Sequence, residues 1–119
     1  MPEAKTYSGA CHCGSVRYDA TVDLSHVMEC NCSHCQRKGF LLTFIPPSQF
    51  KRHSGEQDLI EYQFNKKIIH HLFCKICGVQ PFARGKKPDG SAAIAVNVRC
   101  VEGIDLEALN PIAFDGRNA

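Results

Sequence analysis

Residues 74–78 read CKICG, two cysteines separated by two residues and followed directly by glycine. A C-x-x-C turn of this kind offers two sulfurs to one metal ion, while its backbone N–H groups point at the sulfurs and offset their charge. The glycine permits the left-handed backbone that such a turn often needs. The segment is therefore typical of a zinc knuckle, and it requires two further ligands from elsewhere in the chain.

A second pair of thiols lies near the N-terminus, where residues 11–14 read CHCG. A structural zinc ion takes four ligands, so Cys11 and Cys13 together with Cys74 and Cys77 would complete a site of four thiolates. The metal would then close the intervening chain into a long loop, much as a disulfide does. We expect this site to join the first strands to a late hairpin.

A third group of cysteines lies in residues 30–35, which read CNCSHC. Cys30, Cys32 and Cys35 supply three thiolates without help from the other groups. Three protein ligands, with a fourth position left to water or substrate, are the pattern of catalytic zinc. His34 could cap the ion. We therefore expect a second zinc ion here, with one position open for chemistry.

Cys100 leaves alternatives open. It stands alone after an apolar segment, and it could complete a second closed four-thiolate site, in which case both sites would be structural. It could equally be a buried apolar thiol, as lone cysteines usually are. Eight cysteines in 119 residues could also form the disulfide scaffold of a secreted protein.

The N-terminal residues favour metal binding over disulfides. Residues 1–7 read MPEAKTY, which contains neither an apolar stretch nor a signal-cleavage pattern. We therefore expect a cytoplasmic protein whose thiols stay reduced. No apolar run approaches the roughly 20 residues that a bilayer-spanning helix needs, so we expect no membrane association.

The length and charge of the chain limit the classes of function. A chain of 119 residues has the size of one domain, and we expect a single zinc-binding domain over residues 1–119. The formal net charge is +2 with neutral thiols, but seven thiolates and two zinc ions would bring it to about −1. The basic residues form pairs and no tract, so we expect no nucleic-acid partner.

Strand patterns dominate the rest of the sequence. Apolar and polar residues alternate or form short apolar runs that predict strands; these segments are 15–22, 40–45, 59–64, 68–73 and 92–98. Helix signals are short, one turn over residues 33–38 with Ser33 as its N-cap and another over 105–109. The sequence predicts a mainly β fold.

The cysteine groups and their neighbours resemble a known family, the glutathione-dependent formaldehyde-activating enzymes, also called the centromere protein V family. The resemblance extends over about residues 7 to 117 and depends on five motifs in this order: Cys11-x-Cys13-Gly14-x-Val16, Cys30-x-Cys32-x-x-Cys35-x-Arg37, Cys74-x-x-Cys77-Gly78, Val96-Asn97-Val98-Arg99 and Phe114-Asp115-Gly116-Arg117. Any single C-x-x-C is common, but the combination with the closing Asp-Gly-Arg is specific.

The resemblance implies several small antiparallel sheets around a zinc-ribbon-like core. It also implies that the first and third cysteine groups hold a structural ion and that the middle group holds a second, substrate-facing ion. This assignment agrees with the count of ligands in each group. It leaves Cys100 as a non-ligand.

The resemblance further implies a zinc-dependent carbon–sulfur lyase acting on a small thiol adduct such as S-hydroxymethyl-glutathione. The carboxylates of glutathione would bind nearby cations, and Arg37 and Arg117 are the first candidates, followed by Lys38 and Arg84. Each of these could also be a solvated surface charge. The alternative function is a non-catalytic zinc-binding module that contacts another macromolecule.

Two sets of ring-bearing residues could contribute to the same site. His70 or His71 could bind the second ion or carry a proton, although an inward-facing histidine is more often a hydrogen-bonded core residue. Three phenylalanines could line a substrate cleft or belong to the core; they are Phe44, Phe73 and Phe82.

Overall fold

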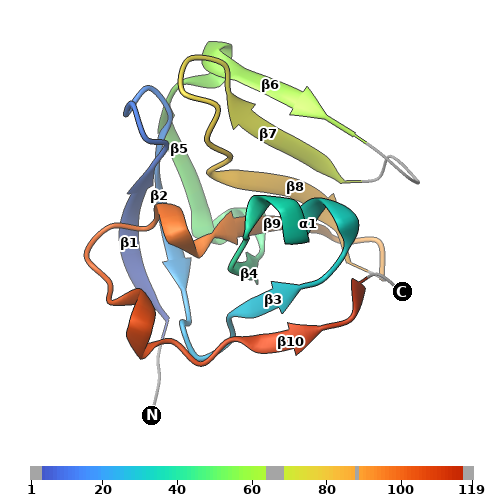
Figure 1. Cartoon of the computed structure of the whole chain (residues 1–119). Helices are drawn as coiled ribbons and strands as arrows, with labels where there is room; N and C mark the ends of the chain where they lie inside the picture. Colours follow the sequence, from blue (N-terminus) through green and yellow to red (C-terminus); the bar gives the residue numbers. More distant parts are fainter. Residues whose placement is uncertain (1–3, 64–68, 88, 117–119) are drawn as a thin grey trace.

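The computed structural model describes residues 4–63, 69–87 and 89–116, and strands make up most of its regular structure. The mainly β prediction is confirmed (Figure 1). Each of the five predicted strand segments contains a strand. Residues 64 and 68, at the ends of two of these segments, lie outside the described residues.

The smaller sheet has three antiparallel strands. Its order is β1 (Lys5–Ala10), β2 (Arg17–Val22) and β5 (Phe50–Ser54). Side chains alternate strictly between the two faces of β2, and those of Tyr18, Ala20 and Val22 are buried. This is the pattern of a strand covered on one face.

The larger sheet has seven strands in the described part of the chain. Its order is β10 (Ile112–Phe114), β3 (Met28–Cys30), β4 (Leu42–Ile45), β9 (Ala92–Asn97), β8 (Phe82–Lys86), β7 (His70–Cys74) and β6 (Leu59–Tyr62). All neighbouring pairs are antiparallel except β10 and β3, which are parallel. The sequence led us to expect several small antiparallel sheets. The larger sheet differs from this expectation, because its C-terminal strand β10 pairs in parallel with β3.

The predicted helical turn over residues 33–38 is present as α1 (Ser33–Lys38). Its N-cap is Cys32 rather than Ser33, because the Cys32 sulfur accepts a hydrogen bond from the Cys35 backbone N–H. Gly39 ends the helix in the left-handed conformation, with φ of 70°. The second predicted helical turn is a short 3-10 helix, Leu106–Ala108.

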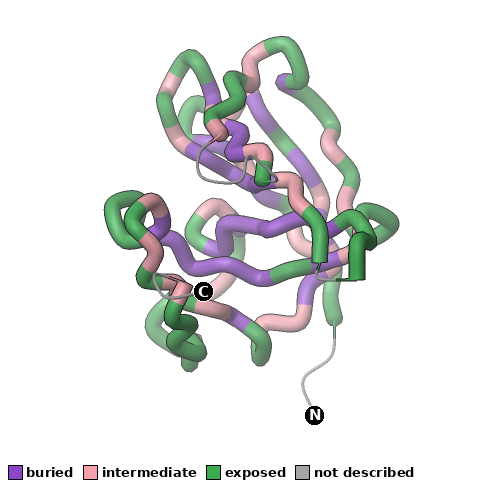
Figure 2. The backbone as a smooth tube through the Cα atoms, turned by 90° about the vertical axis from the view of Figure 1, so that its right-hand side faces the viewer, coloured by how far each residue is buried: buried purple, intermediate pink, exposed green. Residues whose placement is uncertain are grey.

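The main core lies between the two sheets. Side chains from β2 face residues of the larger sheet, including Leu72, Phe82 and Val96. Figure 2 shows these buried stretches running along the inner strands. Tyr18 and Phe82 are almost completely buried, and their ring centroids lie 6.1 Å apart. This core fixes the relative positions of the strands that carry the cysteines.

The opposite face of the larger sheet receives α1. Because side chains alternate along a strand, Phe82 and Val96 point into the main core while Ala83 and Ala95 point to the other face. Cys35 packs against these two alanines. The small methyl side chains let the helix approach the sheet closely.

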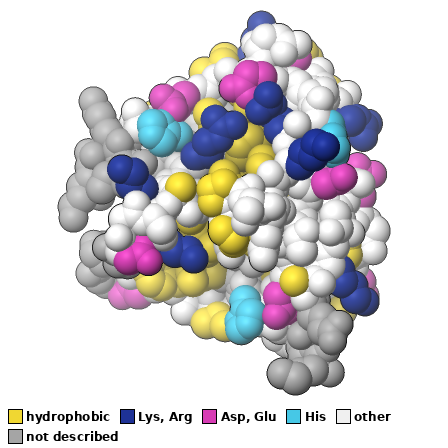
Figure 3. All heavy atoms as spheres, turned by 180° about the vertical axis from the view of Figure 1, so that it is seen from behind, with side chains coloured by type: hydrophobic (Ala, Val, Ile, Leu, Met, Phe, Trp, Pro, Cys, Tyr) yellow, Lys and Arg dark blue, Asp and Glu magenta, His cyan; other side chains and the backbone are white. Residues whose placement is uncertain are grey.

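The surface carries charges of both signs. On the face opposite to the view of Figure 1, basic and acidic side chains are interspersed with exposed hydrophobic ones (Figure 3). None of the helices in the described part of the chain has the length and apolar character needed to cross a bilayer.

We expect the substitution Ala95→Leu to destabilise the protein by about 1–3 kcal/mol, because the larger side chain must displace α1 from the sheet. Urea unfolding followed by circular dichroism measures this change. Ala92→Leu is the matched control, since Ala92 is an exposed position of the same strand. Equal stability of the two variants would show that α1 does not pack tightly on Ala95.

Candidate metal centres

Two turns that are far apart in the sequence bring four sulfurs together. Cys11 and Cys13 lie in the turn between β1 and β2, and Cys74 and Cys77 lie at the end of β7. The Cys13 sulfur is 3.7 Å from that of Cys11 and 3.7 Å from that of Cys74. A tetrahedral zinc ion with bonds of about 2.3 Å holds its sulfurs about 3.8 Å apart. These two distances match that geometry and all four sulfurs lie within 4.8 Å of one another, so this group could hold such an ion.

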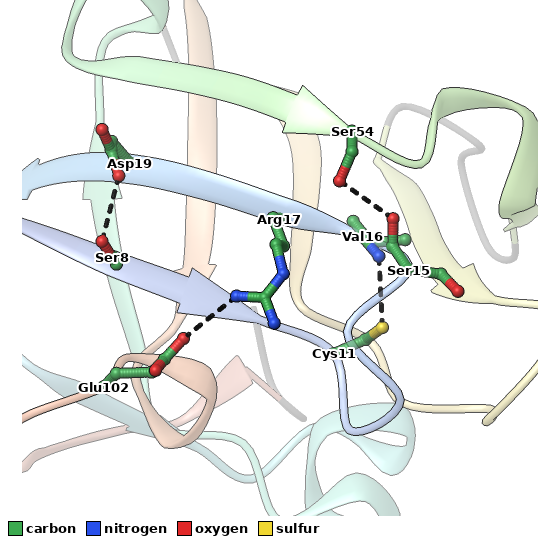
Figure 4. Close-up of polar contacts among 8 residues, drawn as sticks. All are labelled: Ser8, Cys11, Ser15, Val16, Arg17, Asp19, Ser54 and Glu102. Carbon is green, nitrogen blue, oxygen red and sulfur yellow. Dashed lines mark hydrogen bonds and ion pairs between the residues drawn. The ribbon is translucent and has the colours of Figure 1, made fainter.

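Hydrogen bonds support the first of these turns. The Cys11 sulfur accepts a hydrogen bond from the Val16 backbone N–H at 3.4 Å, and the Ser15 carbonyl accepts one from the Ser54 hydroxyl at 3.1 Å (Figure 4). The Ser15 hydroxyl lies 3.3 Å from the Cys13 sulfur, and this hydrogen bond lowers the pKa of the Cys13 thiol. This contact favours the Cys13 thiolate, which is the form that binds a metal.

The second group contains Cys30, Cys32 and Cys35, whose sulfurs all lie within 4.8 Å of one another. Cys30 ends β3, Cys32 caps α1 and Cys35 lies one turn into the helix. The Cys30 sulfur accepts a hydrogen bond from the Cys32 N–H at 3.4 Å, and the Cys32 sulfur accepts one from the Cys35 N–H at 3.3 Å. In the described residues no fourth His, Cys, Asp or Glu side chain joins this group.

The environments of Cys32 and Cys35 differ. Burial works against ionisation of Cys32, but hydrogen bonds, first from the Cys35 backbone N–H, outweigh it and lower the pKa of the Cys32 thiol. Burial raises the pKa of Cys35 well above its ordinary value. The Cys35 thiolate therefore needs a positive charge beside it, and a soft divalent cation bound by all three sulfurs would supply that charge.

The C-terminal segment forms one wall of the second group. Gly116 lies so close to Cys30 that an added Cβ atom would be 2.4 Å from the Cys30 sulfur. The segment is held there by the Asn31 side chain, which donates to the Asp115 carboxylate at 2.9 Å, and by the Asn31 N–H, which donates to the Phe114 carbonyl at 3.2 Å. Any residue larger than glycine at position 116 would therefore displace the Cys30 sulfur.

Comparisons with known proteins agree with this geometry. Residues 6–113 match the family described as glutathione-dependent formaldehyde-activating enzyme. The chain belongs to this family. The fold is also similar to the crystal structure of a Rhodobacter sphaeroides protein, with a TM-score of 0.78 and 27% sequence identity. That match covers 89% of this chain and 97% of the other.

The family match ends before Gly116. The sequence identifies Asp115 and Gly116 only as part of the closing motif and predicts no role for Gly116 at the metal group, because nothing in it shows that β10 pairs with β3. The parallel pairing of these strands carries residue 116 to the sulfur of Cys30. The role of Gly116 could therefore be found only from the structure.

All eight cysteines carry free thiols in the structure, so the disulfide alternative is not realised. Cys100 lies outside both sulfur groups. Its sulfur approaches the Gln80 carbonyl at 3.8 Å, and burial, followed by the nearby Cys11 and Cys77, raises the pKa of its thiol to about 12. Cys100 therefore has the surroundings of a neutral buried thiol close to the first group rather than the second.

The histidines do not join the sulfurs. The His34 ring lies 4.2 Å from the His71 ring and stacks on Tyr62, so it faces β6 and β7 instead of capping the second group. His71 is buried beside the Gln80 amide, with 3.3 Å between its Nδ1 and the amide Nε2. His70 pairs with the carboxylate of Glu61 on the neighbouring strand.

The predicted cationic contacts fall in different places. The Arg37 guanidinium donates to the Ser33 carbonyl at 2.9 Å, which brings it back to the first turn of α1. Lys38 lies over the Phe73 ring, while Arg84 lies beside Phe82 and the Glu56 carboxylate. The predicted contact Arg117 lies outside the described residues.

The three phenylalanines separate into three environments. Phe82 is a core residue. Phe73 lines a pocket beside α1 together with Arg37 and Lys38. Phe44 is 48% exposed on β4 and does not line this pocket.

We expect the substitution Gly116→Ala to remove zinc from the second sulfur group and to leave zinc in the first, because the new methyl group must displace the Cys30 sulfur. Zinc per chain after reconstitution, measured by mass spectrometry, provides the test. Gly85→Ala is the control, because its added carbon would meet only the Ile69 side chain at an ordinary 3.5 Å. Wild-type zinc content in Gly116→Ala would show that the C-terminal segment does not constrain the group.

Proposed function

We propose that this protein binds two zinc ions and acts as a carbon–sulfur lyase on a small thiol adduct such as S-hydroxymethyl-glutathione. Family membership supports the reaction class. The observation that carries the proposal is the difference between the two sulfur groups: the first has four ligands and the second has three. A group of three leaves a coordination position for a substrate sulfur or oxygen.

The first group would hold a structural ion. It joins the turn after β1, in the smaller sheet, to the end of β7 in the larger sheet, across 61 residues of sequence. Closing so long a loop removes much of the conformational freedom of the unfolded chain. The metal would therefore contribute directly to the stability of the fold.

The second group would hold the ion that faces substrate. When bound there, zinc lowers the pKa of a thiol or water ligand and polarises a carbonyl oxygen. In the proposed reaction the carbon–sulfur bond breaks, the electron pair stays on sulfur as a thiolate, and the hydroxyl proton is released as the carbonyl of formaldehyde forms. The reverse reaction joins the same thiolate to formaldehyde.

Backbone and side-chain groups around the second sulfur group hold its cysteines in position. The backbone N–H groups of Cys32 and Cys35 hold two of the sulfurs in place, and the Asn31–Asp115 hydrogen bond holds Gly116 against Cys30. Arg37 and Arg117 stay predicted contacts for the carboxylates of the substrate.

Exchange between formaldehyde, glutathione and their adduct can be followed by two-dimensional NMR without a coupled enzyme. We expect the zinc-loaded protein to accelerate this exchange above its uncatalysed rate and Cys32→Ser to abolish the acceleration with the loss of the second zinc. Serine is a good N-cap, so this variant should keep α1 and the fold.

Cys100→Ser is the matched control, since it also replaces one thiol but lies outside both groups. It should keep both zinc ions and the full acceleration. A protein that carries zinc in both groups yet leaves the exchange at its uncatalysed rate would contradict the lyase and favour a non-catalytic zinc-binding module. Loss of the second zinc from Cys100→Ser would show that the site is closed.

Removal of the first zinc should affect the whole fold. Structural zinc contributes apparent binding free energies of about 10 kcal/mol or more, which is comparable to the entire stability of a small domain. We expect Cys74→Ser, or treatment with a strong chelator, to abolish the cooperative thermal transition, whereas Cys32→Ser should retain it. Circular dichroism during heating distinguishes these cases. Similar transitions in Cys74→Ser and wild type would contradict the structural role.

A further inference from the structure

A pocket of about 380 Å³ lies between α1 and the hairpin of β6 and β7. This volume is within the usual range for sites that bind small organic molecules, and it is much larger than a bound inorganic ion requires. None of the cysteines of the two sulfur groups lines it, and Arg37 is the one lining residue that has a part in the proposed reaction. Its lining residues come from α1, β6, β7 and the segment after β7; they are His34, Arg37, Lys38, Tyr62, Phe73 and Gln80.

The charges at this pocket are positive. Arg37 and Lys38 line it, and none of the six lining residues is acidic. Within the described part of the chain, neither cation has a carboxylate within ion-pair distance. Burial, followed by the nearby His34 and Lys38, lowers the pKa of His71 to about 4, so this histidine adds no charge at neutral pH. The pocket therefore favours an anion.

The walls of the pocket are aromatic. Tyr62 stacks on the His34 ring with 5.6 Å between centroids, and Phe73 forms another part of the lining with the Lys38 ammonium 5.6 Å from its ring centroid. Tyr62 pairs with His71, and Ile60 pairs with Phe73, so these rings lie on one face of the sheet. Aromatic faces of this kind bind a flat, apolar body.

One buried polar atom at this pocket lacks a partner. Gln80 is 4% exposed and lines the pocket, and with its Nε2 assigned toward His71 its Oε1 has no hydrogen-bond partner. A buried acceptor without a donor costs free energy, which a ligand hydroxyl or amine would recover. The ligand should therefore carry a hydrogen-bond donor at a distance from its anionic group.

The pocket is separate from the thiolates. Successive residues of an α-helix turn by about 100°, so His34 and Arg37 lie on the far side of α1 from Cys32. None of the three cysteines lines the pocket, and Phe40 packs against Cys35 while its ring lies 5.6 Å from that of His34. A ligand in the pocket does not need to touch the metal.

We propose that this pocket is a binding site for a small aromatic carboxylate that carries a hydroxyl or amino group, and that it works independently of the second metal ion. The carboxylate lies near Arg37 and Lys38, the ring lies against Tyr62 and Phe73, and the donor reaches Gln80. This proposal does not depend on the lyase reaction.

The probe is 4-hydroxybenzoate, titrated into the zinc-loaded protein and followed by ¹H–¹⁵N NMR, including the side-chain amide of Gln80. We expect saturable shifts at the lining residues. Benzoate, which lacks the donor, and 4-hydroxybenzyl alcohol, which lacks the charge, should each bind more weakly, and acetate should cause no saturable shift. Equal affinity for the acid and the alcohol, or shifts confined to other parts of the molecule, would overturn the proposal.

Two sets of variants test separately the role of the positive charges in the pocket and the independence of the pocket from the second metal ion. Lys38→Gln should weaken the binding of 4-hydroxybenzoate about two- to fivefold, as expected for an exposed charge. The double variant Lys38→Gln with Arg37→Gln should weaken it about tenfold. Neither variant should change the binding of the neutral alcohol. Lys51→Gln, an exposed lysine of β5, is the matched control and should have no effect.

Cys32→Ser should bind 4-hydroxybenzoate with unchanged affinity even though it lacks the second metal ion. Loss of binding in this variant, with α1 still folded by NMR, would show that the pocket belongs to the metal site. Failure of the lyase test would leave this result untouched, because the titration measures binding without turnover.

Discussion

The contact between the two turns that carry Cys11, Cys13, Cys74 and Cys77 is the constraint on which the rest of the structure depends. Two negative charges about 4 Å apart repel by about 4 kcal/mol at an effective dielectric constant of 20, and here the Cys13 sulfur has two neighbours at 3.7 Å. Four thiolates at these distances are stable only around a cation. The two sheets meet at this point. They can therefore enclose their core only when a cation neutralises the negative charge of the thiolates.

The second sulfur group is built differently, and this difference explains how it could take part in chemistry. Its three cysteines lie within six residues of one another, so they close no long loop and bind the sheets together less strongly. Their positions depend instead on the cap of α1, on the alanines beneath Cys35 and on Gly116 beside Cys30. A site supported in this way can change its ligands without opening the main core.

The sequence predicted the features that depend on local spacing. The grouping of the cysteines, the turn at Ser33–Lys38 and the alternation in β2 follow from residues that are close in the chain. Among distant contacts, only the grouping of Cys11 and Cys13 with Cys74 and Cys77 was predicted, because a structural zinc ion needs four ligands. The parallel contact of β10 with β3 joins residues about 84 apart, and no pattern in the sequence indicates it. The direction of His34 was also missed, because the sequence does not show that Tyr62 of β6 and His71 of β7 lie beside α1.

Helix α1 is short, yet it has two chemically different sides. One side carries soft sulfur ligands above Ala83 and Ala95, and the other carries two cations and an imidazole beside aromatic rings. Because the helix is only six residues long, its cap at Cys32 and its end at Gly39 determine the position of both sides together. Binding on one side is independent of the other only while these ends hold the helix rigid. The packing of Cys35 on the two alanines also fixes α1 against the sheet, so the same small residues position both the cysteines and the residues that line the pocket.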